Sequence, residues 1–310
     1  MKENYFRSKK GFLTLSVITM ACWGALYPLV KISYRLFEID TSDIPSVILY
    51  AGVRFLISGI ILVALTSAFS KKVSVPRGRT LLYVLFIGLF ATVFHYILTY
   101  SSITLIDASK AAILKQIGSL FVICFASFFS RGERFTSGKL AGGLIGFASI
   151  ILININGITL SFSLGDALVV GASFCIVIAG FVSKKSYKKD DPFYVTAWSQ
   201  LAGGIILCVT GIILGGSIPR LSFMGTAVFA LICTASMVGY LLWNKLLKYH
   251  EFSSLSVIKF LESVFAALFS ALILGENVFK WTYLASFVLV CAGIMLSEKS
   301  VSFRPAKKLF

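Results

Sequence analysis

Ten apolar segments, each of about 20 residues and separated by short polar loops, constrain this chain more than any other feature of its sequence. A helix of about 20 apolar residues is long enough to cross the hydrocarbon core of a bilayer. Of the 310 residues, 57% are hydrophobic and 14% are charged, whereas soluble domains carry about 25% charged residues. The composition therefore predicts an all-α integral membrane protein and argues against a soluble enzyme or a disordered scaffold. The ten predicted transmembrane helices are 12–36, 45–69, 80–101, 108–129, 137–156, 165–183, 193–214, 222–243, 253–274 and 279–297.

The distribution of charge indicates which loops face the cytoplasm. The chain has 29 basic and 13 acidic residues, a net charge of +16, which alone could suggest nucleic-acid binding. The lysines and arginines, however, lie in short clusters between apolar segments and form no basic face. Most of them share one side if the N-terminus is cytoplasmic, while the first loop on the other side contains Glu38, Asp40 and Asp43. By the positive-inside rule we expect a multi-pass plasma-membrane protein with cytoplasmic N- and C-termini and no nucleic-acid partner.

The two halves of the sequence are related by an internal repeat. Residues 91–125 align with residues 235–269, and five segments in each half would make the second half enter the membrane from the opposite side. Many secondary transporters are built from such inverted repeats, with the substrate site near the midplane where the halves meet. We therefore expect two inverted five-helix repeats, residues 1–156 and 157–310. The identical aligned pairs are Ala91/Ala235, Tyr96/Tyr240, Leu98/Leu242, Ser109/Ser253, Lys115/Lys259, Ser119/Ser263, Phe121/Phe265 and Phe125/Phe269.

Short motifs give the sequence a resemblance to a known family. The run ESVFAAL at 262–268, followed by LGE at 274–276, resembles the LEPVFAAL…LGE signature of the EamA branch of the drug/metabolite transporter (DMT) superfamily. Trp23-Gly24 and the run RFL at 54–56 are also similar to that family. The resemblance implies ten helices in two inverted five-helix halves around a central cavity that opens alternately to each side. Ser263 stands where the family often has proline, which leaves open whether segment nine contains a helix break.

Two lysines lie where a bilayer would reject a charge. Lys115 and Lys259 are near the middle of segments four and nine and correspond to each other in the repeat. A lysine at the centre of a transmembrane helix costs about 2.5–3.5 kcal/mol on insertion, and such residues are usually functional. An inverted twofold relation would place both ammonium groups on opposing walls of one cavity, where they could bind a carboxylate or a phosphate. The resemblance supports this, since sugar-phosphate translocators of the same superfamily hold phosphate with lysines in comparable helices. The alternatives are that each lysine extends to the headgroups or pairs with an internal acid.

Four further residues are candidates for contact with a substrate. Glu262 follows Lys259 by three residues on the same helical face, so it could couple transport to protons, bind a substrate amine, or neutralise Lys259. Tyr96 and Tyr240, which are also repeat mates, could hydrogen-bond a substrate or pack between helices. Trp23 could line the cavity or pack against neighbouring helices.

Other polar residues in the segments are expected to have structural roles. Arg54 and Lys31 lie toward the outer ends of their segments, which favours a structural role or contact with lipid headgroups. His95 has no acid nearby in the sequence and is expected to be a packed residue. Glu133 and Glu276 each follow a glycine at a segment end and are expected to cap the next helix.

The sequence contains no hydrolase, nucleotide-binding or metal-binding motif, so we expect no enzyme activity, no cofactor and no metal. It favours a secondary transporter that moves a small anionic or zwitterionic organic metabolite by alternating access, with coupling to protons or exchange as its energy source. Such a metabolite would be an amino acid, an organic acid or a phosphorylated compound. The expected partners are this small-molecule substrate, the lipid bilayer and a proton, and the sequence sets no oligomeric state. The alternatives are a drug or amine exporter governed by Glu262, and a membrane-embedded enzyme or lipid-handling protein.

Overall fold

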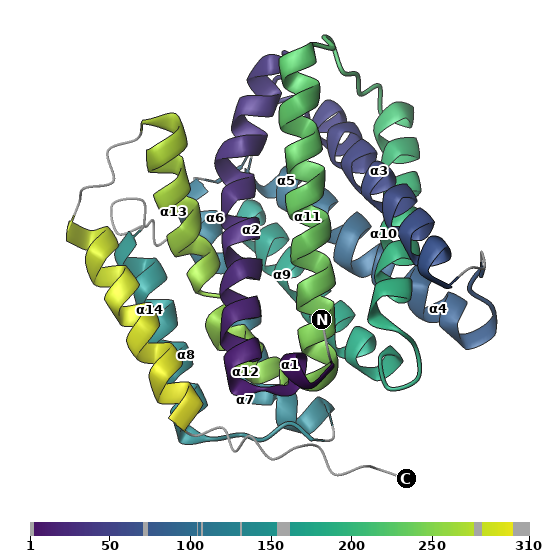
Figure 1. Ribbon diagram of the computed structural model, residues 1–310. Coiled ribbons are helices and arrows are strands. Elements are labelled where there is room, and N and C mark those ends of the chain that lie inside the picture. The colour runs from purple at the N-terminus through teal and green to yellow at the C-terminus, as the bar shows by residue number, and fades with distance from the viewer. Residues whose placement is uncertain are drawn as a thin grey trace.

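Every element of regular structure in the described residues is a helix (Figure 1). The computed structural model describes residues 3–70, 74–103, 105–106, 108–130, 132–153, 162–275 and 281–299. The helices of the first half are α1 (Glu3–Arg7), α2 (Lys9–Leu36), α3 (Ile44–Ser70), α4 (Gly78–Ile87), the π-helix η1 (Gly88–Phe94), α5 (His95–Ile103), α6 (Ala108–Lys115), α7 (Ile117–Phe129) and α8 (Ser137–Ile153). Those of the second half are α9 (Leu164–Ser186), α10 (Pro192–Ile213), α11 (Phe223–Tyr249), α12 (Phe252–Ile258), α13 (Leu261–Leu274) and α14 (Trp281–Lys299).

The length and apolar character of these helices fit a membrane protein. Eight helical segments in the described residues are long and apolar enough to cross a bilayer. Two shorter apolar helices, Ser137–Leu152 and Leu284–Ser297, coincide with the predicted segments five and ten. Large apolar side chains such as Phe69, Phe128 and Phe223 are exposed on the outside of the bundle, where a lipid environment would cover them. The chain is therefore an all-helical membrane protein, as its composition predicts.

Close pairs of helices hold the bundle together. The long helix α3 packs along α10, α14 packs along α8, and α2 lies against both α11 and α13 (Figure 1). Between α8 and α14 the backbones almost touch, because a Cβ atom added to Gly142 would lie 2.4 Å from the carbonyl oxygen of Gly293. Gly24 on α2 is equally close to Phe265 on α13. Small residues at such crossings let helices in a membrane gain contact area without a side chain between them.

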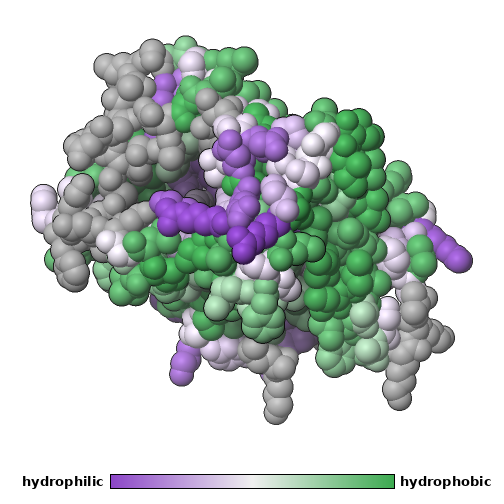
Figure 2. All heavy atoms as spheres, turned by 90° about the horizontal axis from the view of Figure 1, so that it is seen from above, coloured by the Kyte–Doolittle hydropathy of each residue, from purple (hydrophilic) through white to green (hydrophobic). Residues whose placement is uncertain are grey.

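The two ends of the bundle differ in what they carry. Helix α1, the α7–α8 junction and the α11–α12 junction lie together at the lower end of Figure 1, which we call the α1 end. The α2–α3 loop lies at the opposite end. Seen from that opposite end, the face is hollowed, and hydrophilic atoms lie inside the hollow (Figure 2). Polar groups therefore lie within the outline of a molecule whose outside is largely apolar.

Three of the predicted segments are interrupted helices. The third contains the seven-residue π-helix η1 between α4 and α5. The fourth breaks at Gln116, between α6 and α7, and the ninth breaks at Lys259 and Phe260, between α12 and α13. The ninth segment thus has a helix break without the proline that the resemblance suggested. The break frees backbone groups from the helical ladder, which is tolerated in a membrane where those groups lie inside the protein or line a cavity.

Candidate functional site

Lys115 and Lys259, which align in the predicted repeat, lie at two of these helix breaks. Lys115 is the last residue of α6, and Lys259 follows the last residue of α12. At the second break the chain tightens into short turns, in which the Glu262 N–H donates to the Lys259 carbonyl over 3.0 Å. In transporters, interrupted helices commonly form substrate and ion sites, because their free ends present dipoles and unpaired backbone groups. Lys115 and Lys259 therefore both lie at helix breaks of this kind.

Lys115 and Glu262 meet at a tyrosine that the sequence did not single out. The Lys115 ammonium donates to the Tyr27 hydroxyl over 3.0 Å, and that hydroxyl donates to Oε1 of Glu262 over 3.1 Å. The direct distance from Lys115 Nζ to the same oxygen is 3.4 Å. The three residues come from α6, α2 and α13, so this group, the central cluster, joins the two halves of the chain. One sequence signal was available, since Tyr27 lies four residues after Trp23 on the same face of α2.

The central cluster is only partly buried. Tyr27 exposes 48% of its surface although its hydroxyl bonds to side chains on two other helices. The Lys115 side chain exposes 27% and the Glu262 side chain 8%. Two of the three members of the cluster are therefore accessible in part, so a small molecule could contact Tyr27 and Lys115 directly.

Lys259 lies nearby without a bonded acid. It is partly exposed and lies three residues before Glu262, at the break between α12 and α13. Within the part of the chain that the structure describes, its ammonium makes no hydrogen bond and no ion pair. Among the described residues Glu262 forms its ion pair with Lys115, which lies on another helix, and not with Lys259. The centre keeps two lysines for one carboxylate.

Aromatic side chains from both halves form a wall beside the central cluster. The Trp23 ring centroid lies 5.4 Å from that of Tyr240, which in turn lies 6.0 Å from that of Phe55. Phe55 also contacts Tyr96, with centroids 4.9 Å apart. The structure thus brings together the three predicted aromatic residues, through a phenylalanine that was not predicted. Rings in this arrangement can surround the apolar part of a small molecule while the tyrosine hydroxyls bind its polar part.

The structure confirms some of the predictions for the other polar residues of the segments and contradicts one. His95 is buried, with Nδ1 3.0 Å from the Ala172 carbonyl oxygen, which confirms that it is a packed residue. Lys31 is exposed, as expected near the end of its segment. Arg54, in contrast, is only 4% exposed, so the expectation that it could reach the headgroups is wrong. Glu276 lies outside the described residues.

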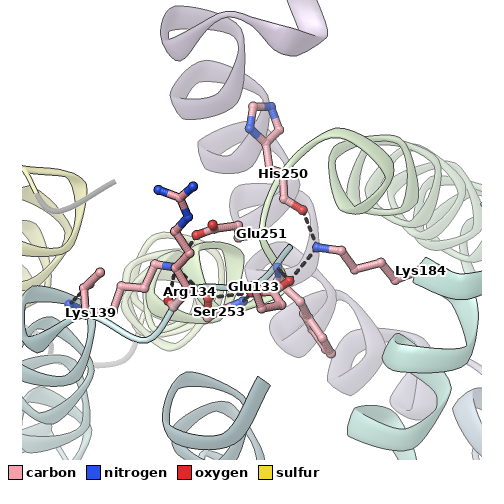
Figure 3. Close-up of polar contacts among 9 residues, drawn as sticks. Glu133, Arg134, Lys139, Lys184, His250, Glu251 and Ser253 are labelled. Atoms are coloured by element: carbon pink, nitrogen blue, oxygen red, sulfur yellow. Dashed lines mark hydrogen bonds and ion pairs between the residues drawn. The ribbon is translucent and has the colours of Figure 1, made fainter. Parts of the chain in front are cut away.

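A second group of charged side chains lies at the α1 end (Figure 3). Glu133, in the α7–α8 junction, accepts hydrogen bonds from Lys184 Nζ over 2.5 Å and from the Phe252 N–H over 2.6 Å. It also accepts bonds from the Ser253 backbone N–H and hydroxyl. Glu133 thus caps a helix, as expected, but the helix is α12 and not the adjacent α8. Burial alone would raise the pKa of Glu133, but Lys184 and these N–H and O–H donors outweigh it and hold the pKa below its ordinary value of 4.5.

A second ion pair completes this group. Lys139, at the start of α8, pairs with Glu251 and also donates to the Arg134 carbonyl over 2.8 Å and to the Ser253 hydroxyl over 2.9 Å. Lys184 makes its other bond to the His250 carbonyl over 2.8 Å (Figure 3). We call this group the α1-end cluster. It ties the α7–α8 junction to the end of α9 and to the α11–α12 junction.

The described residues contain no group of three or more histidine, cysteine, aspartate or glutamate side chains that could hold a metal ion. The polar groups at the centre are instead two lysines, a carboxylate and tyrosine hydroxyls. This set is suited to binding an organic ion through hydrogen bonds and opposite charges.

A family model, two related proteins and a solved structure all match nearly the whole of this chain. The model of the EamA-like transporter family matches this chain twice, over residues 10–155 and 163–298. An uncharacterized transporter of Bacillus subtilis (strain 168), YoaV, is 25% identical over 300 residues, which are 95% of this chain and 97% of that protein. A probable amino-acid metabolite efflux pump of Escherichia coli (strain K12) is 26% identical over 316 residues, with 97% and 98% covered. One solved crystal structure shares the fold, with a TM-score of 0.72, 17% identity, and coverage of 92% of this chain and 99% of that one.

Proposed function

This chain belongs to the EamA-like transporter family, and from that premise we propose that it is a secondary transporter for a small anionic or zwitterionic organic metabolite. The proposed cargo is an amino acid, an organic acid or a phosphorylated metabolite. The observation that carries the proposal is the central cluster, in which Tyr27, Lys115 and Glu262 meet beside Lys259, a lysine with no ion pair among the described residues. Two lysines and one carboxylate leave one net positive charge, which favours a cargo with a negative group.

We further propose that ten helices cross the membrane as two inverted repeats, residues 1–156 and 157–310. The double match of the family model supports two repeats. The packing supports a twofold relation between them, because α2 contacts α11 and α13 while α9 contacts α5 and α7. These pairs exchange when the halves are interchanged, and the pairs α3–α10 and α8–α14 map onto themselves. A site on such an axis can be opened to either side by the same motion.

In this proposal each central residue has its own task. Lys115 and Lys259 bind the negative group of the cargo, and the aromatic wall of Trp23, Tyr96 and Tyr240 surrounds its remaining part. Glu262 binds a cargo amine or exchanges a proton when the cargo disturbs its bond to Lys115. The net charge of the site therefore changes as cargo enters and leaves, which would link transport to an ion gradient.

We place the protein in the plasma membrane with both termini in the cytoplasm. Basic residues concentrate at the α1 end, among them Lys184, Lys185, Lys188 and Lys189, and the positive-inside rule puts such an end in the cytoplasm. The hollow at the opposite end then opens to the outside (Figure 2). Partners in this arrangement are the cargo and the bilayer, with a proton as the candidate coupling ion.

Purified protein in liposomes tests the proposal. Cargo is first identified by its effect on the unfolding temperature, since a ligand that binds only the folded state stabilises it by mass action. We expect uptake of that cargo to fall at least tenfold in Lys259→Met. The control Lys185→Met also removes one lysine, but at an exposed position of the α1 end, and should leave uptake unchanged. Unchanged uptake in Lys259→Met would reject the site. Stabilisation only by amines that compete with protons would favour a drug or amine exporter instead.

A further inference from the structure

Arg54 is the most unusual charged residue of the bundle. It lies ten residues into α3, about 15 Å along the helix from Ile44, and is 4% exposed. In the described chain, its Nε and Nη2 atoms are buried and make no hydrogen bond. A guanidinium group stays charged under all ordinary conditions, and a buried, unpaired charge is costly to a fold. A residue of this kind therefore calls for a function that outweighs its cost.

The surroundings of Arg54 stabilise its charge without using its N–H groups. The guanidinium carbon lies 4.6 Å from the ring centroid of Phe55 and 5.2 Å from that of Tyr96. Such cation–π contacts use the faces of the rings and leave the N–H edge of the guanidinium free. Among the described residues, no carboxylate lies within ion-pair distance of Arg54.

The Arg54 side chain shares its aromatic neighbours with the central cluster. Phe55 and Tyr96, the rings that Arg54 lies over, belong to the aromatic wall, and Tyr240 links that wall to Trp23 on α2, four residues before Tyr27. The wall therefore runs from Arg54 toward the helix that carries Tyr27 of the central cluster. A molecule bound along this wall would contact both Arg54 and the central cluster.

The free edge of Arg54 selects one kind of negative group. Nε and Nη2 point their hydrogens in parallel, in the geometry that binds the two oxygens of one carboxylate. The aromatic surroundings provide a single buried positive charge, which neutralises a monoanionic carboxylate fully and a dianionic phosphate only in part. A lysine in its place would supply a compact charge without the paired donors.

We propose that Arg54 binds the carboxylate of the cargo through Nε and Nη2, and so restricts transport to carboxylate-bearing molecules. This inference rests on the proposed function and narrows it. Lys115, Lys259 and Glu262 then contact the other polar groups of the cargo, and a phosphorylated compound without a carboxylate is excluded. Arg54 has the position and the unpaired donors for this task, and no partner within the described chain satisfies them.

A first experiment needs no ligand. In Arg54→Met a flexible apolar side chain replaces the buried guanidinium. If the arginine serves cargo binding, this substitution removes an uncompensated charge, and the unfolding temperature of the ligand-free protein should stay the same or rise. A clear fall in the unfolding temperature would mean that Arg54 serves the fold, and would overturn the proposal. Arg79→Met, at an exposed arginine of α4, is the control for loss of one guanidinium.

A second experiment uses the twenty L-amino acids, acetate, lactate and pyruvate as probes, each compared with its carboxamide. We expect at least one carboxylate to raise the unfolding temperature of the wild-type protein, and its carboxamide to have no effect. The Kd of that carboxylate should rise at least tenfold in both Arg54→Met and Arg54→Lys, and should not change in Arg79→Met. Absence of any stabilising carboxylate, or an unchanged Kd in Arg54→Met, would overturn the proposal.

The two proposals fail in different ways. If the identified carboxylate is transported by the wild type and by Arg54→Met but not by Lys259→Met, the transport site stands and Arg54 is not part of it. If wild-type protein in liposomes transports none of the probes or any other cargo found by binding, the proposed function itself fails.

Discussion

The α1-end cluster and the charges at the centre of the bundle are satisfied to different degrees. In the α1-end cluster two acids face two lysines, and Glu133 also accepts bonds from Phe252 and Ser253. At the centre Glu262 is the one bonded acid beside Lys115, and in the described chain Lys259 and Arg54 have no acid partner. A network in which every charged group has its partners holds helices together, whereas a charged group without a partner is available to bind a ligand. We therefore propose that the α1-end cluster stabilises the fold and that the centre binds cargo.

The largest effect on stability should come from Glu133→Gln. This change leaves Lys184 buried without its counter-charge and weakens the cap of α12, which should cost about 3 kcal/mol of unfolding free energy. Because the pKa of Glu133 is lowered in the folded protein, its stabilising effect is present above pH 4.5 and is lost as the pH falls through the lower, folded value. Thermal unfolding in detergent between pH 3.5 and 7.5 measures both the loss of stability in Glu133→Gln and the pH dependence of stability in the wild type. Glu3→Gln, at an exposed acid of the same end, is the matched control. Equal stability of the two variants would remove the structural role of the cluster.

The next largest effect should be on transport, from Glu262→Gln at the centre. Loss of this carboxylate removes the charge that Lys115 and Tyr27 bond, so uptake of the identified cargo should fall tenfold or more. The unfolding temperature should fall less than in Glu133→Gln, because the partly exposed Lys115 can be hydrated when its partner is lost. The reverse order of the two stability losses would contradict the assignment of the two clusters.

Tyr27→Phe should raise the Kd for cargo moderately. It tests whether the hydrogen bonds of the hydroxyl matter in addition to the charges of Lys115 and Glu262. The variant removes a hydroxyl that bonds both Lys115 and Glu262 but keeps the ring and both charges. One such bond contributes about 1 kcal/mol, which corresponds to a roughly fivefold higher Kd for cargo. Tyr83→Phe, which loses only a bond from exposed Arg79, should bind cargo normally. A Kd in Tyr27→Phe equal to that of the wild type would mean that the hydroxyl does not contribute to cargo binding.

The sequence predicted the extent of the helices well and their interruptions poorly. Segment 12–36 became Lys9–Leu36 and segment 193–214 became Pro192–Ile213, because hydropathy is a property of each stretch by itself. The breaks at Gln116 and at Lys259–Phe260 have no proline or glycine at their positions. These breaks depend on how the helices pack against one another, and the residues next to each break do not reveal that packing.

The same reason explains which residues of the proposed site could be predicted from the sequence. Lys115, Lys259 and Glu262 are charges inside apolar segments, so the sequence alone marks them as exceptional. Tyr27 resembles any other tyrosine of a transmembrane segment until its partners on α6 and α13 are known. Arg54 was judged by its distance from the segment end, but the direction of its side chain decides whether it meets lipid or the interior.

The smallest effect that we predict concerns His250, which joins the α1-end cluster to the first helix. Its Nε2 donates to the Phe6 carbonyl over 2.6 Å, and burial lowers its pKa below the ordinary 6.5. The unfolded chain therefore takes up a proton at this residue at a higher pH than the folded protein does, and stability is lost as the pH falls from 6.5 toward the lower pKa of the folded protein.

In His250→Gln this loss of stability should disappear, so the difference in unfolding temperature between wild type and variant should shrink from pH 7.5 to pH 5.5. The contact between the rings of Phe12 and His250 is also lost, but that loss does not depend on pH. His95, the other histidine of the chain, is present in both proteins and cancels from the comparison. A difference that stays constant with pH would mean that the bond to α1 contributes no pH dependence, and that the α1-end cluster is a purely fixed support for the bundle.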